Sequence, residues 1–208
     1  MKSTLVLLFI ITATNSACWQ TEKSKELINQ AIDIFLFSSL DETIKIDSSL
    51  SLTKKALELD DENISVLTHM VTLLFLKRDG EGLIKVADKL IQLKPNVPTH
   101  IEQKAVYLEL MGEYEEAMIY FDKAEKIYEE LLNDDPLNFG IMLGYVGCLE
   151  YSGNVPKANS LLEKMKKMNF EDYQLEILEH YKEQFVSKEQ LMKYWSGEID
   201  INQLTKDM

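Results

Sequence analysis

The chain has 208 residues, of which 46% are hydrophobic and 27% are charged, so it can bury a core and is not disordered by composition. Thirty-five acidic against 22 basic side chains give a net charge of −13, which disfavours binding to nucleic acid or to an anionic membrane surface. Four prolines and eight glycines are too few for a sandwich of many short strands, so the composition favours long helices.

The first 17 residues have the layout of a secretory signal peptide. Lys2 supplies the positive charge, residues 5–11 form an apolar run, and residues 12–17 are small or polar. The apolar run is far shorter than the roughly 20 residues of a membrane-spanning helix. We therefore expect residues 1–17 to direct export and then to be removed.

The end of this segment, Ser16-Ala17-Cys18, resembles the lipobox of bacterial lipoproteins, whose cysteine is diacylated and becomes the new N-terminus. Asn15 departs from the pattern, because an aliphatic residue usually stands there. The resemblance implies lipidation at Cys18, a short linker over residues 18–22, and a membrane-anchored protein that faces the periplasm. Trp19 replaces the aspartate that would favour the inner membrane, so the outer membrane is favoured. The alternative is a soluble periplasmic or secreted protein cut by the ordinary signal peptidase.

The chain contains two cysteines, Cys18 and Cys148. If Cys18 carries lipid, Cys148 is a single thiol in an oxidising compartment, and its apolar neighbourhood GYVGCLEY predicts that it is buried. A disulfide between the two cysteines is the alternative.

An internal repeat of 34 residues runs through the middle of the chain. Two predicted helical stretches end 34 residues apart, at Leu59-Asp60-Asp61 and at Leu93-Lys94-Pro95. The period then recurs with seven added residues, so that Gly112, Ala117 and Phe121 return as Gly153, Ala158 and Leu162. Seven residues are about two helical turns, so this insertion lengthens a helix, over residues 129–133, without rotating its apolar face.

A helix-turn-helix unit of this period resembles the tetratricopeptide repeat. Residues 107–128 resemble its consensus closely, with Gly112 at the turn and then Ala117, Phe121 and Ala124 at the family spacing. Arg78 replaces the turn glycine in the preceding unit. The resemblance covers residues 23–168 and implies an all-α solenoid of about four helical hairpins.

Two features test this repeat frame. Lys104 interrupts the apolar stripe of its helix, so it either buries its stem and keeps its ammonium group in water or marks a misplaced frame. Residues 169–208, where the period fades, are predicted to form capping helices over 172–185 and 188–195. Ser187 and Gln190 predict a capping box at the second of these helices, and residues 201–208 are expected to fray.

No catalytic or metal-binding constellation is found. The three histidines do not have metal-ligand spacing, and the nucleophile, phosphate-loop and zinc-protease motifs do not occur. Acidic clusters at residues 60–62 and 134–135 fall where helices should end, which indicates solvated loops rather than paired catalytic carboxylates. We therefore predict a protein that is not an enzyme and that uses no cofactor or metal.

In tetratricopeptide arrays the first helix of each pair lines a concave groove that holds partner peptides or helices, and the resemblance implies such a groove here. The face beside each packing stripe presents three residues per first helix at the spacing i, i+4, i+7. The predicted partner-binding residues are Thr68, Thr72, Phe75, Glu102, Val106, Glu109, Leu143, Gly147 and Glu150. Carboxylates around Phe75 and Leu143 favour a basic protein partner with apolar anchors.

Three functions are compatible with these features. The first is a lipid-anchored adaptor that binds another cell-envelope protein through its groove, with the membrane contacted only by the N-terminal lipid. The second is an immunity protein that neutralises a basic toxin delivered to the periplasm. The third is a scaffold whose groove is filled by its own C-terminal helices, which leaves the outer face to act.

Overall fold

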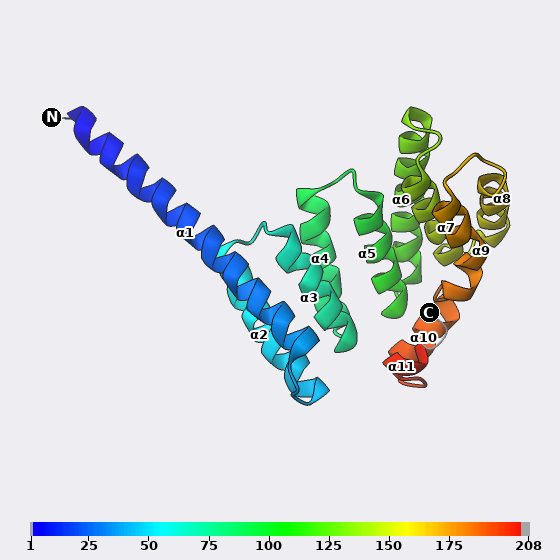
Figure 1. The fold of residues 1–208 in the computed structure, drawn as a ribbon, viewed down its shortest axis with the longest axis horizontal. Helices are drawn as coiled ribbons and strands as arrows, with labels where there is room; N and C mark the ends of the chain where they lie inside the picture. Colours follow the sequence, from blue (N-terminus) through cyan, green and yellow to red (C-terminus); the bar gives the residue numbers. More distant parts are fainter. Residues whose placement is uncertain (1, 205–208) are drawn as a thin grey trace. The chain divides into compact units, whose positions relative to one another are not determined.

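The computed structural model describes the backbone of residues 2–204 and the side chains of residues 20–204. Within these residues the chain forms eleven helices and no strand, which confirms the predicted all-α fold of helical hairpins (Figure 1). No helix in this described part of the chain is both long and apolar enough to cross a membrane. The chain divides into two compact units, Met1–Asp79 and Gly80–Met208.

The first unit contains α1 (Lys2–Phe37), α2 (Glu42–Leu59) and α3 (Ile64–Leu76). The predicted signal peptide forms the first half of α1, and the side chain of Cys18 lies outside the described residues. Small residues let α1 and α2 approach closely, because Ser24 Oγ donates to the Ala56 carbonyl at 2.9 Å and Ser49 Oγ donates to the Ala31 carbonyl at 2.8 Å. Each buried hydroxyl is thus satisfied by the facing helix.

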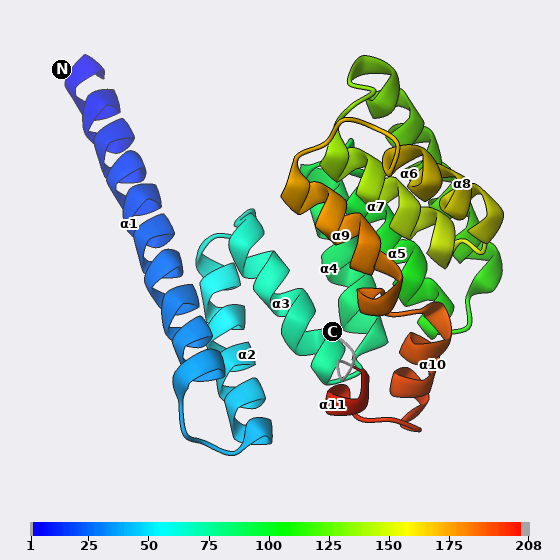
Figure 2. The same ribbon diagram turned by 45° about the vertical axis from the view of Figure 1, so that its right-hand side comes forward.

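The second unit contains α4 (Gly80–Leu93), α5 (Pro98–Leu110), α6 (Tyr114–Asp134), α7 (Phe139–Tyr151) and α8 (Val155–Met165), followed by α9 (Asp172–Gln184), α10 (Lys188–Ser196) and α11 (Ile201–Leu204). From α4 to α8 each helix packs against the next one in the chain, and α5 also contacts α7. Figure 2 shows α9 and α10 beside these hairpins. The hydrophobic core of this unit includes Ala117, Phe121 and Ala124, which are fully buried.

The helix boundaries follow the predicted period. Helices α3, α5 and α7 begin at Ile64, Pro98 and Phe139, which are 34 and 41 residues apart. Helices α4, α6 and α8 begin at Gly80, Tyr114 and Val155, with the same two spacings. The seven added residues lengthen α6, which has 21 residues against 14 in α4. The insertion therefore extends a helix, as the sequence predicts.

The turns inside the three successive repeats use one backbone geometry. Arg78, Gly112 and Gly153 occupy equivalent positions with φ of 54°, 85° and 87°. At Gly112 the N–H of Glu113 donates to the Leu108 carbonyl at 2.8 Å, which closes a Schellman motif at the end of α5. Glycine takes this left-handed conformation without strain, whereas arginine does so at a cost.

Lys104 does not keep its ammonium group in water, contrary to one sequence expectation. The side chain is buried, and Nζ donates to Asp88 Oδ1 at 2.6 Å and to the Tyr120 hydroxyl at 2.8 Å. Burial alone would lower the pKa of Lys104, but these two hydrogen bonds outweigh it and raise that pKa. This lysine therefore joins α5 to both of its neighbours, α4 and α6.

Helix caps account for the acidic clusters and for the C-terminal elements. Asn63 and Asn138 cap α3 and α7, and their side-chain amides donate to Asp60 Oδ2 at 3.4 Å and Asp135 Oδ2 at 3.0 Å. The predicted capping box of α10 is present, with Ser187 and Gln190 bonded reciprocally. The prediction that residues 201–208 fray is wrong for Ile201–Leu204, which form α11 because Leu204 is buried.

Candidate functional site

The predicted groove residues of the second unit lie together on one surface. Glu102, Val106 and Glu109 follow one side of α5, while Leu143, Gly147 and Glu150 follow one side of α7. The two helices contact each other directly. We call the surface formed by these six residues the α5–α7 face.

The chain's own C-terminal segment, residues 172–196, covers much of the α5–α7 face. Lys182 on α9 forms an ion pair with Glu150, and Lys188 at the start of α10 forms one with Glu109. The two glutamate side chains are only 10% and 7% exposed, whereas Lys182 and Lys188 are 49% and 40% exposed. Each lysine thus neutralises a nearly buried carboxylate.

Aromatic contacts join the C-terminal segment to α7 between these ion pairs. The Tyr151 hydroxyl donates to the Val186 carbonyl at 2.9 Å, and the rings of Tyr151 and Phe185 are 5.0 Å apart. Phe185 also stacks on Tyr181, with 5.3 Å between the ring centroids. Leu178 on α9 is buried in the core of the unit. The segment therefore contacts the face through cations and aromatic rings together.

Two open cavities adjoin the C-terminal segment, and Tyr151 lines both of them. The first, of about 270 Å³, is lined mainly by α5 and by Leu191 of α10. The second, of about 380 Å³, lies among Leu143, Tyr151 and the α9 end of the segment. Both are partly open to solvent and are lined largely by apolar atoms.

Glu102 is a buried acid at the centre of the α5–α7 face. It accepts a hydrogen bond of 3.0 Å from the Tyr128 hydroxyl, and burial raises the pKa of Glu102 to about 7 against the opposing effect of that bond. A methyl group on Gly147 would lie 3.7 Å from Glu102 Oε1 and 3.8 Å from the Tyr181 hydroxyl. That hydroxyl is buried without a hydrogen-bond partner among the described residues.

The third predicted triplet lies on α3 of the first unit. Thr68 is exposed and its hydroxyl donates to the Ile64 carbonyl at 2.9 Å. Thr72 is exposed and Phe75 is half-buried, both on α3. Half-buried His69 lies beside this triplet on α3, with its Nε2 atom 2.9 Å from Ser49 Oγ.

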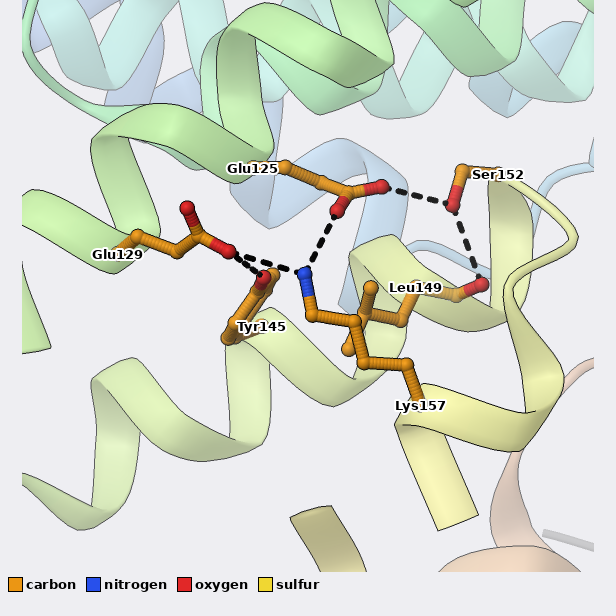
Figure 3. Close-up of polar contacts among 6 residues, drawn as sticks. All are labelled: Glu125, Glu129, Tyr145, Leu149, Ser152 and Lys157. Atoms are coloured by element: carbon orange, nitrogen blue, oxygen red, sulfur yellow. Dashed lines mark hydrogen bonds and ion pairs between the residues drawn. The ribbon is translucent and has the colours of Figure 1, made fainter. Parts of the chain in front are cut away.

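A second polar cluster, shown in Figure 3, joins α6 to the α7–α8 hairpin. Lys157 Nζ lies 2.9 Å from Glu129 and 3.3 Å from Glu125, and the Tyr145 hydroxyl donates to Glu129 at 2.7 Å. Ser152 Oγ lies 3.2 Å from both Glu125 and the Leu149 carbonyl. Glu129 belongs to the added turns of α6, so the insertion supplies part of this connection.

The described residues offer little for catalysis. No group of three or more histidine, cysteine or acidic side chains within them could hold a metal ion. Cys148 is buried, as predicted, and burial raises the pKa of its thiol, which keeps it protonated and unreactive at neutral pH. The features that stand out are those of a binding surface.

Sequence reasoning found the acidic face but did not identify Lys182 and Lys188 as its contacts. A usable signal was present, since Lys182 and Lys188 flank the aromatic residue Phe185 in an otherwise acidic segment. Their chemistry matches the basic partner with apolar anchors that the face predicts. The match could have indicated that the C-terminal segment binds there.

No protein-family model and no curated protein matches the chain. Among solved structures, the chain is similar to "MamA MSR-1 C2", with 16% sequence identity and a TM-score of 0.38. That alignment covers 74% of this chain and 98% of the other. Function is therefore argued from the site itself.

Proposed function

We propose that the protein is an exported, lipid-anchored adaptor of the cell envelope that binds another envelope protein through the α5–α7 face. The observation that supports binding is that this face already holds a polypeptide segment. Two ion pairs and a set of aromatic contacts recognise that segment, and each is a contact that a partner chain could make.

Charge favours a basic partner. Without the C-terminal segment, the face presents Glu109 and Glu150 beside the apolar side chains of Val106 and Leu143. The whole chain carries a net charge of −13, which speeds the approach of a positively charged protein and repels an acidic one.

The membrane anchor rests on the signal sequence and on Cys18. A mass spectrum of the protein recovered from its own membranes, beside a Cys18→Ala variant, tests it. We expect a diacyl or triacyl mass on the wild-type chain and none on the variant. An unmodified wild-type chain that begins near Cys18 would contradict the anchor and would leave a soluble exported adaptor.

Partner binding is tested by cross-linking in those membranes followed by purification of the adduct. A Glu109→Lys/Glu150→Lys variant makes the face basic, and Glu113→Lys/Glu116→Lys is the matched control because both of these glutamates are exposed at the start of α6. We expect the first variant to lose the partner adduct and the control to keep it. Equal adducts from both variants, with circular dichroism showing folded protein in each, would contradict the proposal.

A further inference from the structure

We infer that residues 181–188 act as an internal ligand of the α5–α7 face, and that the partner displaces them with a segment of the same chemistry: two cations six residues apart with an aromatic residue between them. This inference rests on the proposed adaptor function and names the kind of segment that the adaptor binds.

The spacing of the contacts supports this inference. Lys182 and Lys188 pair with Glu150 on α7 and Glu109 on α5, so the two cations reach both helices of the face. Phe185 lies midway between the lysines in the sequence and contacts Tyr151. The face therefore recognises a cation–aromatic–cation pattern rather than a single charge.

The C-terminal segment is held loosely enough to be displaced. Leu178 is the one buried residue of α9, most of which is exposed, and Tyr194 is the one buried residue of α10, most of which is half-buried. Both lysines are also 40% or more exposed, which limits what each ion pair contributes. The two cavities that Tyr151 lines expose apolar surface beside the segment, which a partner could cover.

The two nearly buried glutamates define the partner further. A segment that leaves Glu109 or Glu150 unpaired would bury an uncompensated charge, so cations at both positions are required. Arginine would serve better than lysine, because its guanidinium group can donate two parallel hydrogen bonds to one carboxylate. An acidic or purely apolar segment is excluded.

The probe is a fluorescent peptide with the sequence of residues 180–190, HYKEQFVSKEQ, added to the full-length chain. A Lys182→Glu/Lys188→Glu variant repels the internal ligand from the face. Lys123→Glu/Lys126→Glu, which changes two exposed lysines on α6, is the control with the same net charge. Because an internal ligand competes at a high effective concentration, we expect the peptide to bind the first variant at least about tenfold more tightly than wild type or control.

Equal affinity for all three chains, or no binding to the Lys182→Glu/Lys188→Glu variant, would overturn the inference. A charge swap gives a second readout. The Glu109→Lys/Glu150→Lys chain should lose the peptide and should bind a peptide with glutamate at both lysine positions. Failure of the swapped pair, with a folded chain, would also overturn it.

These outcomes separate the inference from the proposed function. Peptide binding without any envelope partner would leave the recognition chemistry intact and contradict the adaptor function. An envelope partner captured through Glu109 and Glu150, with no peptide binding, would support the adaptor function and contradict the internal ligand.

Discussion

Lys188 forms an ion pair with Glu109, which lies 79 residues earlier in the chain. The same ammonium group donates to the Tyr151 carbonyl at 3.3 Å. One side chain thus joins the first residue of α10 to the last turn of α5 and the end of α7. This contact places the C-terminal segment on the α5–α7 face.

Replacing Lys188 with methionine should leave the Glu109 carboxylate buried without a cation. We expect the free energy of unfolding to fall by about 1–3 kcal/mol, measured by urea denaturation. Lys193→Met is the control on the same helix, because its partner Glu189 is 77% exposed, and it should leave stability nearly unchanged. Equal effects of the two substitutions would show that Glu109 is not held by Lys188.

Glu102 should make stability depend on pH. Its pKa is raised from 4.5 to about 7 by burial, so the folded chain binds a proton that the unfolded chain has released. The stabilisation is present below pH 4.5 and is lost as the pH rises through 7, by up to about 3 kcal/mol. The Glu102→Gln variant should lack this decline, as measured by urea denaturation at several pH values. Parallel profiles for variant and wild type would contradict the assignment.

The turn positions should respond oppositely to substitution. Gly112→Ala puts a Cβ on a residue with φ of 85°, which we expect to cost about 1–2 kcal/mol. Arg78→Gly removes the steric cost of a side chain at positive φ, and it should be neutral or stabilising by up to about 1 kcal/mol. Gly140→Ala is the helical control in the first turn of α7, where the nearest atom to a new Cβ would be Asn138 Oδ1 at 3.6 Å, so it should not destabilise. Thermal melts that show equal losses at Gly112 and Gly140 would refute this account of the turns.

Ala117→Leu tests the closest contact between α5 and α6. Ala117 is fully buried in the core, so three extra carbons overpack it and should cost about 1–3 kcal/mol. Met118→Leu, at the neighbouring exposed position of α6, should be nearly neutral in the same thermal melt. A melt of the Ala117 variant that matches wild type would show that the helices do not meet there.

The repeat architecture could be predicted because it depends on local patterns. The pattern of Gly112, Ala117 and Phe121 returns 41 residues later, which is one 34-residue period plus an insertion that keeps the helical phase, so the helix boundaries followed from spacing. The burial of Cys148 and the capping box at Ser187 followed from their immediate neighbours in the sequence. Each of these features is set within one helix or one hairpin.

The contacts of the C-terminal segment could not be predicted in the same way. The pairing of Lys188 with Glu109 depends on how a segment outside the repeat folds back, and no period fixes that path. The burial of the Lys104 ammonium group was not predicted for the same reason, because its partners Asp88 and Tyr120 come from the helices on either side. Long-range polar contacts of this kind could be identified only from the structure.

The most direct test of the account is photo-cross-linking in the protein's own membranes from a benzoylphenylalanine residue placed at Val106. This position lines the cavity on the α5–α7 face, whereas Ile119 is exposed on α6 and serves as the control. We predict an adduct with an envelope protein from Val106 and none from Ile119. The yield from Val106 should rise when Lys182 and Lys188 are both changed to glutamate. Adducts from Ile119 alone, or equal adducts from both positions, would contradict the proposal that this face binds the partner.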